Sequence, residues 1–452
     1  MDKSDRPKTF EEAFAKKIAE ETAAETAPKF KNKSDDKKVL KIIVLVAMGL
    51  IILGLLAYLI LFMKTSPVYL GDKIFGETSP KLAETAETQS ADSTSETSEE
   101  AAASTPVDKK KIYSILSGEE IADEALNSSP TFCVQIPNGM DGARPQAGLN
   151  EAKIVFEAIA EAGITRFAAI FQNPTVSAIG PIRSLRIYYF DWDVPFDCTV
   201  VHAGGASDAI SALNSSSLKN HDENYTYMWR SSKNNALNRM WNNLFTSSEM
   251  LKKFNSDRSY LSSDVKAFSR FTPAEESLEK ISAQVVEKLD IDTEANGNTD
   301  TLEPKVTKIN IHIGNMPTFN PVYTYNESKN SYDRAYENGD PHEVYNCVEK
   351  SGEITPEVDC GDPVQLSPKV VIAMMVKERK QSDNYHEDIS TIGYGDAFIF
   401  ENGIVIRGSW EKTSKSEQII FRNADDKEIK LNPDQTWITA VPESYGGTVD
   451  WE

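Results

Sequence analysis

Two apolar runs early in the globular part of the chain carry the clearest pattern. Residues 154–161 and 164–171 are almost continuously apolar, and Ala162-Gly163 lies between them. Two such runs around a glycine-containing turn are typical of a β-hairpin. With a two-residue turn, we expect Glu161 to face Ile164 across the hairpin.

Further strands flank this hairpin. A short apolar run predicts a strand at 131–136, and a buried-type strand is predicted at 198–202. A glycine turn then leads into a predicted helix at 207–213. This order of strand, glycine turn and helix favours a mixed α/β domain over residues 111–300.

The last third of the chain alternates between apolar runs and turn residues. Asn402-Gly403 supplies the positive φ angles that a tight hairpin turn needs. We therefore predict a β-rich domain over residues 301–452, with strands at 370–376, 396–406, 419–421 and 436–441. Residues 254–296, which contain an amphipathic stretch at 278–289, are predicted to be a helical connector.

Residues 42–63 are uniformly apolar and contain no charged side chain. A helix of that length is about 33 Å long, enough to cross a hydrocarbon core of about 30 Å. Lysines crowd its N-terminal side, which predicts a cytoplasmic tail at 1–41 and extracytoplasmic domains. The Ser/Thr/Glu-rich residues 64–110 are predicted to be a disordered linker. The expected fold class is a single-pass membrane anchor, with the lipid bilayer as a partner, plus an α+β ectodomain.

Charge narrows the functional classes. The chain has 69 acidic and 48 basic residues, for a net charge of −21. A surface this acidic repels nucleic acid, so we expect no nucleic-acid partner. No phosphate-binding loop, hydrolase nucleophile or zinc-protease motif occurs, and we expect no cofactor.

The four cysteines all follow the apolar segment. Cys347 and Cys360 lie in polar loop sequence and would close a short loop, which favours a disulfide between them outside the cytoplasm. Cys133 and Cys198 lie in apolar strands, where buried thiols and a second disulfide are both open. Neither a Cys-x-x-Cys pair nor a histidine cluster near cysteine occurs, so we expect no metal site.

Charged residues of the predicted hairpin form the first candidate site. If side chains simply alternate, Glu157, Ile159 and Glu161 share one face, and Ile159 faces Arg166. Arg166 would then lie diagonal to both carboxylates. This arrangement fits an ordinary cross-strand salt bridge, a ligand-binding cleft, or a glycosidase-like carboxylate pair.

Two further groups could bind an anion. If Pro181 starts a helical turn, Arg183 and Arg186 are neighbours one turn apart, and two guanidinium groups suit a phosphate or carboxylate. They could equally pair with nearby acidic residues. His202 precedes Gly204 and Gly205, whose backbone could approach a ligand closely. A histidine at a strand end is also common as a satisfied core residue.

Several motifs, taken together, resemble the YerB-like lipoproteins, a bacterial family described as domain of unknown function 3048. They are found at residues 143–149, 154–157, 163–166, 179–184 and 201–205, and, nearer the C-terminus, at 393–408 and 429–438. The resemblance covers residues 112–445 and implies an extracytoplasmic protein with an N-terminal and a C-terminal domain. It implies no activity.

The resemblance adds Arg144, Arg230 and Asn243 as candidate ligand-binding residues. Two departures are notable. Family members are often anchored through a lipidated cysteine, and this chain has no cysteine near residues 42–63. Where the family has a Pro-His-Asn-Leu-Tyr run, this chain has residues 241–247 without a histidine, so chemistry that needs this histidine is not expected.

Three functions remain open at this point. The first is a non-catalytic module of the cell envelope that binds wall polymer, or an envelope or membrane protein, through the candidate arginines and His202. The second is a hydrolase of wall glycan or peptide that uses Glu157 or Glu161 as acid/base. The third is an adaptor that docks a cytoplasmic partner on an apolar stripe of Phe10, Phe14 and Ile18.

Overall fold

The computed structural model describes residues 111–140, 142–231, 242–277, 305–347, 360–383 and 385–452. The described residues belong to one compact unit. The predicted tail at 1–41, the apolar segment at 42–63, the linker at 64–110 and the amphipathic stretch at 278–289 lie outside the described residues.

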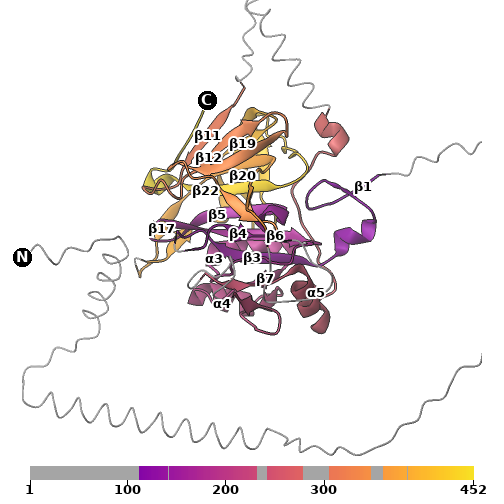
Figure 1. Cartoon of the computed structure of the whole chain (residues 1–452). Coiled ribbons are helices and arrows are strands. Elements are labelled where there is room, and N and C mark those ends of the chain that lie inside the picture. Colours follow the sequence, from indigo (N-terminus) through magenta and orange to yellow (C-terminus); the bar gives the residue numbers. More distant parts are fainter. Residues whose placement is uncertain (1–110, 141, 232–241, 278–304, 348–359, 384) are drawn as a thin grey trace, which may run out of the picture. The chain divides into compact units, whose positions relative to one another are not determined.

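A ten-stranded mixed sheet organises the described chain. Figure 1 shows β22, β5, β6, β3 and β7 stacked in that order. From one edge to the other, the strands are β21 (Ile420–Asn423), β20 (Ile404–Lys412), β19 (Gly393–Glu401), β16 (Val370–Val376), β22 (Thr436–Pro442), β5 (Ile154–Glu161), β6 (Ile164–Gln172), β3 (Thr131–Pro137), β7 (Thr199–Val201) and β8 (Lys219–His221). Strands from both ends of the described sequence meet where β22 pairs in parallel with β5.

Two hairpins in this sheet have the turns that the sequence predicts. Ala162 and Gly163 join β5 to β6 with φ angles of 50° and 80°, and Asn402 and Gly403 join β19 to β20 with φ angles of 55° and 74°. Positive φ at both central residues matches the right-handed twist of paired strands. Both hairpins therefore form where local sequence favours them.

The two faces of the sheet bury separate cores, because side chains alternate along each strand. On one face, Phe156 stacks on Trp192 of α3 (Ile187–Asp193), with ring centroids 5.2 Å apart. On the other face, Phe167 makes an edge contact with Trp437 at 5.2 Å. This second core also includes Tyr323 from a smaller sheet.

The smaller elements cover the second face and the ends of the sheet. A four-stranded sheet has the order β13 (Ser331–Tyr336), β12 (Pro321–Asn326), β11 (Lys308–His312) and β23 (Thr448–Trp451), and a three-stranded sheet has β15 (Val364–Gln365), β14 (Glu343–Tyr345) and β4 (Gln146–Ala147). The strand pairs are β1 (Ile112–Tyr113) with β2 (Glu120–Ile121), β9 (Trp229–Arg230) with β10 (Leu244–Phe245), and β17 (Glu378–Lys380) with β18 (Glu387–Ile389).

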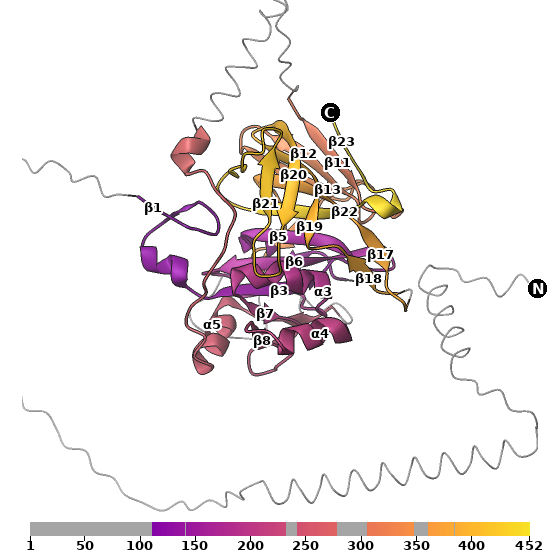
Figure 2. The same cartoon turned by 180° about the vertical axis from the view of Figure 1, so that it is seen from behind.

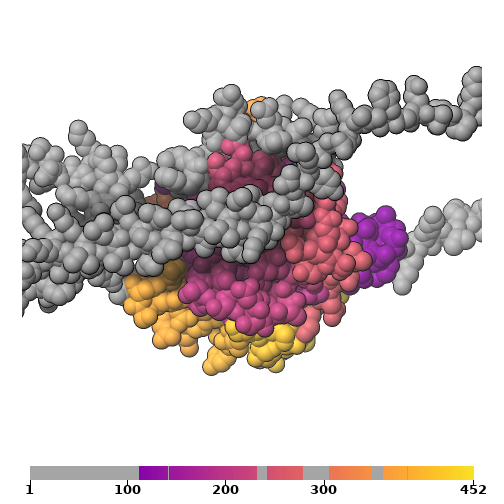
Figure 3. Space-filling view, turned by 90° about the horizontal axis from the view of Figure 1, so that it is seen from below, coloured from indigo at the N-terminus to yellow at the C-terminus, as the bar shows by residue number. Residues whose placement is uncertain are grey.

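The α-helices of the described chain are short. Besides α3 they include α4 (Ser207–Asn214) and α5 (Ser248–Asp257), and one-turn 3-10 helices are η1 (Glu124–Ser128), η2 (Leu149–Glu151), η3 (Val194–Phe196) and η4 (Glu443–Tyr445). From behind, β17 and β18 lie to the side of α3 and α4 (Figure 2). From below, magenta surface that includes α4 borders orange surface from later residues (Figure 3). One contact between these two parts of the chain is a hydrogen bond from Gln381 Nε2 to Asp208 Oδ2 of α4, at 3.2 Å.

The predicted fold class is wrong. Over the described residues the structure is β-rich, with 41% strand and 15% helix, rather than an α/β domain followed by a β domain. The physical reason is that residues 131–201 supply four strands of the large sheet, β3, β5, β6 and β7, whereas α3, the α-helix among them, has only seven residues. No helix of the described residues is long and apolar enough to cross a membrane, so a single-pass anchor is not shown.

The predicted helical connector is also mostly wrong where it can be seen. Helix α5 ends at Asp257, residues 258–272 contain no helix, and a helical turn resumes only at 273–277. The intervening chain is held instead by backbone hydrogen bonds to other segments. Lys266 N–H donates to Pro195 O of η3, and Phe271 N–H donates to Leu431 O before β22, each at 2.9 Å.

Candidate functional site

Many candidate residues lie where aligned strands of the main sheet end. Strands β5 and β3 both run antiparallel to β6, and β7 runs parallel to β3. The carboxyl ends of β5, β3 and β7 therefore lie at the same end of the sheet. Glu161 ends β5 and His202 follows β7 at this end.

Glu161 forms ion pairs with two arginines at this end of the sheet. Its two carboxylate oxygens accept hydrogen bonds from Arg166 Nη2 and Arg186 Nη2, each at 2.7 Å. Burial alone would raise the pKa of Glu161, but the two guanidinium groups outweigh it and hold the pKa below its usual value. Two positive charges therefore share one negative charge. We call these three residues the arginine cluster.

Each arginine of the cluster keeps an unused donor. Arg166 Nη1 donates to Ser184 O at 2.6 Å and Arg186 Nη1 to Leu185 O at 3.2 Å. The Nε–H groups of both arginines are buried and have no hydrogen-bond partner in the described part of the chain. Both residues are 7% exposed. The cluster is thus well fixed, with hydrogen-bonding capacity left over.

A β-bulge separates the two glutamates that simple alternation would place together. Glu161 faces Ile164 as predicted, but the register shifts between Ile159 and Glu161, so Arg166 faces Ala158 instead of Ile159. Glu157 faces Phe167 and therefore lies on the opposite side of the sheet from Arg166. The prediction that Arg166 is diagonal to both carboxylates is wrong.

Glu157 belongs to a buried polar network between early and late parts of the chain. Its side chain is 0% exposed and accepts from Arg334 Nη2 at 2.8 Å, Trp437 Nε1 at 3.1 Å and Thr165 Oγ1 at 3.0 Å. The sequence alone did not single out Arg334 or Trp437. They lie far from Glu157 along the chain, and no local pattern marks their contact.

Arg144 and His342 extend this network. Arg144 Nε donates to Asn138 Oδ1 at 2.8 Å, and its guanidinium lies 3.6 Å from the ring centre of Tyr336. Burial, Arg334 and Arg144 together hold the pKa of His342 well below its usual value. The neutral ring can accept from Arg334 at Nδ1 and donate from Nε2 to Gln146 Oε1 at 2.9 Å. These contacts give Arg144 a structural role.

Arg183 contacts residues outside the arginine cluster. Residues 181–186 do not form the helical turn that would make Arg183 and Arg186 neighbours, since α3 begins only at Ile187. Arg183 Nε donates to Asn242 Oδ1 at 2.8 Å, and its backbone N–H donates to Gln135 O at 2.8 Å. The predicted two-arginine anion site instead pairs Arg186 with Arg166.

The polar groups of His202 and Gly204, in the glycine turn after β7, already form hydrogen bonds within the chain. His202 is fully buried, with Nδ1 2.8 Å from Gly204 O and Nε2 2.9 Å from Asn220 Oδ1. Gly204 N donates to Asp222 Oδ1 at 2.8 Å. At Gly205, a Cβ atom would lie 3.0 Å from the backbone oxygen of Leu185, a tight contact that favours glycine there.

Arg230 and Asn243 form a separate group on the surface. Arg230 donates to Asn243 Oδ1 at 2.9 Å, to Glu223 Oε1 at 2.7 Å and to Tyr225 Oη at 3.0 Å. Exposed ion pairs of this kind contribute about 0–1 kcal/mol to stability. These two residues do not reach the arginine cluster through any described contact.

The hairpin of β17 and β18 lies beside the arginine cluster and was not singled out by the sequence. His386, near its tip, forms a backbone bridge with Glu161. At its base, burial and the neighbouring Glu387 raise the pKa of Glu378 to about 8, although Lys380 acts in the opposite direction. Glu378 is 3% exposed, and neither carboxylate oxygen has a partner in the described chain.

Both cysteine pairs are bonded. Cys347 is joined to Cys360, and Cys133 in β3 is joined to Cys198 just before the neighbouring strand β7. Among the described residues, no group of three or more His, Cys, Asp or Glu side chains is arranged to hold a metal ion.

Sequence comparison places both parts of this architecture in one family. The N-terminal domain of "Protein of unknown function (DUF3048)" matches residues 116–261, and the C-terminal domain of the same family matches residues 309–438. The chain belongs to the DUF3048 family. The predicted resemblance is thereby confirmed, and every residue of the arginine cluster lies in the N-terminal match.

A curated relative and a solved structure agree with this assignment. The DUF3048 chain is 26% identical over 341 residues to "Putative lipoprotein YerB" of Bacillus subtilis (strain 168), covering 75% of this chain and 88% of the relative. It also matches a crystal structure of the YerB protein from Bacillus subtilis with a TM-score of 0.55 and 21% identity, covering 75% of this chain and all of the other. The structural match concerns the fold alone.

Proposed function

We propose that this DUF3048 protein is a membrane-associated, extracytoplasmic binding module that recognises an anionic group of the cell envelope at the arginine cluster. The cluster itself carries the proposal, because Arg166 and Arg186 share a single carboxylate and each has an unpartnered buried Nε–H. A carboxylate or phosphate could accept from these donors and balance the remaining positive charge. The extracytoplasmic setting rests on the lipoprotein name of the Bacillus relative.

Access to the cluster would involve the tip of the β17–β18 hairpin. Tyr385 is 43% exposed, and the charges of the cluster act on its hydroxyl, which places it close by. Both arginines are nearly buried in the present arrangement. A ligand would therefore displace this tip, and the anionic wall polymer of the envelope is the ligand class that we propose.

The hydrolase alternative finds no support in the geometry. The bulge places Glu157 and Glu161 on opposite faces of the sheet, so they cannot flank one scissile bond. Glu157 is fixed by Arg334 and Trp437, and the lowered pKa of Glu161 is the wrong direction for a general acid. The adaptor alternative depends on Phe10, Phe14 and Ile18, which lie outside the described residues.

Binding of the full-length chain to purified cell-wall sacculi tests the proposal. We expect Arg186→Gln to weaken binding at least about tenfold, because it removes a charge-assisted contact. Arg379→Gln is the control: Arg379 lies on the β17–β18 hairpin in an exposed pair with Asp388, and its replacement should leave binding unchanged. Circular dichroism should show that each variant is folded.

A second variant tests the same site at an exposed position, where a substitution should leave the protein folded. Tyr385→Ala changes an exposed side chain at the hairpin tip and should alter affinity without altering stability. If folded Arg186→Gln and Tyr385→Ala proteins both bind sacculi like the wild type, the arginine cluster is not the binding site. Release of soluble wall fragments by the wild type would instead revive the hydrolase alternative.

A further inference from the structure

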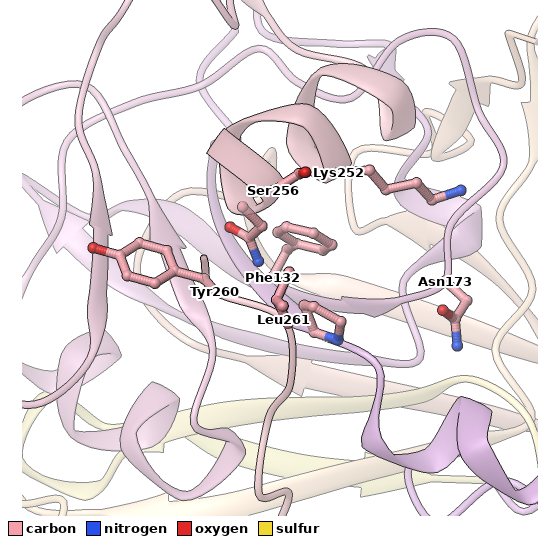
Figure 4. A pocket seen from close by; sticks show the side chains of 8 residues that line it. Phe132, Asn173, Lys252, Ser256, Tyr260 and Leu261 are labelled. Carbon is pink, nitrogen blue, oxygen red and sulfur yellow. The ribbon is translucent and has the colours of Figure 1, made fainter. Parts of the chain in front are cut away.

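A small pocket lies at the end of the main sheet opposite to the arginine cluster. Pro130 and Phe132, at the start of β3, line it, whereas Arg166 faces Pro137 at the other end of the same strand. Figure 4 shows Lys252 and Ser256 on α5 above Phe132 and Leu261, with Tyr260 and Asn173 on either side. The pocket has a volume of about 210 Å³. Its position makes it independent of the function proposed above.

The size and walls of the pocket suit a compact apolar group. A cavity of about 150 Å³ with apolar walls is large enough for benzene. This pocket is somewhat larger, and is lined by Phe132, Pro130, Tyr260 and Leu261. Leu261 is 70% exposed, so an apolar side chain faces water at the mouth. A ring or branched aliphatic group would bury it favourably.

One polar atom of the pocket lacks a partner. Asn255 is 2% exposed, and its Oδ1 accepts from Thr199 Oγ1 at 2.9 Å. Its Nδ2 is buried and has no hydrogen-bond partner in the described chain. A buried donor without an acceptor destabilises the protein, and a ligand oxygen would satisfy it. A ligand with an acceptor at this point would gain that hydrogen bond.

A cation on the rim indicates that this acceptor is charged. Lys252 is exposed on α5 and lines the pocket, and it makes no ion pair within the described part of the chain. The adjacent Lys253, by contrast, pairs with Asp257 at 2.6 Å. Asn255 and Lys252 together offer one neutral and one charged donor, which matches a carboxylate.

We infer that this pocket binds an apolar carboxylate. The ring or branched aliphatic body occupies the space beside Phe132 and Leu261, and the carboxylate accepts from Asn255 Nδ2 and Lys252 Nζ. Two sources share this chemistry: a small free acid, and an apolar residue at the carboxyl terminus of a peptide.

Saturation-transfer NMR with the full-length chain tests the inference. The probes are phenylacetate and N-acetylglycyl-leucine, each compared with its uncharged amide. We expect at least one acid to bind at millimolar concentration, and its amide to bind about tenfold more weakly or not at all. Binding of phenylacetate alone identifies a free acid as the ligand type, and binding of the dipeptide alone identifies a peptide terminus.

Variants of exposed residues locate the site without disturbing the fold. Lys252→Glu should weaken binding of the acid at least about tenfold, and Ser256→Phe should abolish it by filling the pocket. Lys253→Glu is the matched control and should bind like the wild type. The inference is overturned if neither acid binds, if the amides bind as well as the acids, or if Lys252→Glu and Ser256→Phe leave affinity unchanged.

Discussion

Glu161 is the residue on which the arginine cluster depends. Its side chain is 17% exposed and bridges two guanidinium groups that would otherwise repel each other at close range. Removing one member of a buried ion pair costs more than the pair contributes, because the remaining charge stays buried without compensation. Glu161 thus fixes the geometry of the site and also limits its net positive charge.

Glu161→Gln should lower the free energy of unfolding by about 2 kcal/mol at pH 7. Because the folded pKa lies below the ordinary 4.5, ionised Glu161 stabilises the protein above about pH 4.5. This contribution disappears as the pH falls through the folded pKa, so variant and wild type should converge in acid. Urea unfolding between pH 3 and pH 7 measures the difference.

The matched control is Glu223→Gln, which breaks the more exposed pair with Arg230. It should cost less than about 1 kcal/mol. Equal costs for the two variants at pH 7 would contradict a special role for Glu161. If Glu161→Gln is destabilised by the same amount at pH 3 and pH 7, its effect is not that of an ionised carboxylate.

At the scale of elements, the β17–β18 hairpin lies beside the arginine cluster and carries buried carboxylates at the end farthest from its tip. Gln381 donates a hydrogen bond to Asp208 of α4, and His386 bridges to Glu161 at the end of β5, so the hairpin links α4 to the main sheet. Glu378 and Glu387 are both 3% exposed on this hairpin. Two carboxylates in one buried place favour a protonated form of one of them.

Glu378→Gln should therefore change how stability depends on pH. The folded state keeps a proton on Glu378 up to about pH 8, whereas the unfolded chain releases it near 4.5. Wild-type stability should fall between these values by at most about 1.4 kcal/mol per pH unit, and the variant should lack this contribution. Unfolding at pH 5, 6, 7 and 8 measures both slopes.

Asp388→Asn provides the control on the same hairpin, because Asp388 is half-buried and pairs with the exposed Arg379. Its slope should match that of the wild type. Parallel slopes for Glu378→Gln and the wild type would show that Glu378 is ionised throughout. In that case the hairpin could not respond to pH through this residue.

The same elements show what local sequence can and cannot predict. The turns at Ala162-Gly163 and Asn402-Gly403 were predictable because positive φ favours a few residue types. The bulge beside Ala160 carries no such signal, since alanine fits a regular strand equally well, and it overturns the expected face of Glu157. The contact between Glu157 and Arg334 joins residues 177 positions apart, and no local periodicity encodes it.

At the scale of the whole molecule, the two family domains share one sheet. Strand β22, which the C-terminal match reaches, pairs with β5 of the N-terminal match from Thr436↔Ile154 to Thr439↔Glu157. Both faces of the sheet bury side chains from both parts of the chain. Glu161 of the arginine cluster therefore lies on a strand whose neighbour comes from the other family domain.

It follows that the N-terminal family domain should not fold alone. A chain of residues 111–300 lacks β22, Arg334 and Trp437, so β5 becomes an open edge and Glu157 is left buried without its cation. An uncompensated buried charge costs about 3–5 kcal/mol, a large part of the stability of a typical domain. We expect poor amide dispersion by NMR and rapid proteolysis.

Co-expression with residues 301–452 is the matched control, because it restores β22 beside β5 and Arg334 beside Glu157. The two pieces should associate and regain resistance to protease. A well-dispersed spectrum from residues 111–300 alone would mean that the shared sheet is not needed for folding. The arginine cluster could then form without the C-terminal domain, and sacculus binding could be assigned to the N-terminal domain by itself.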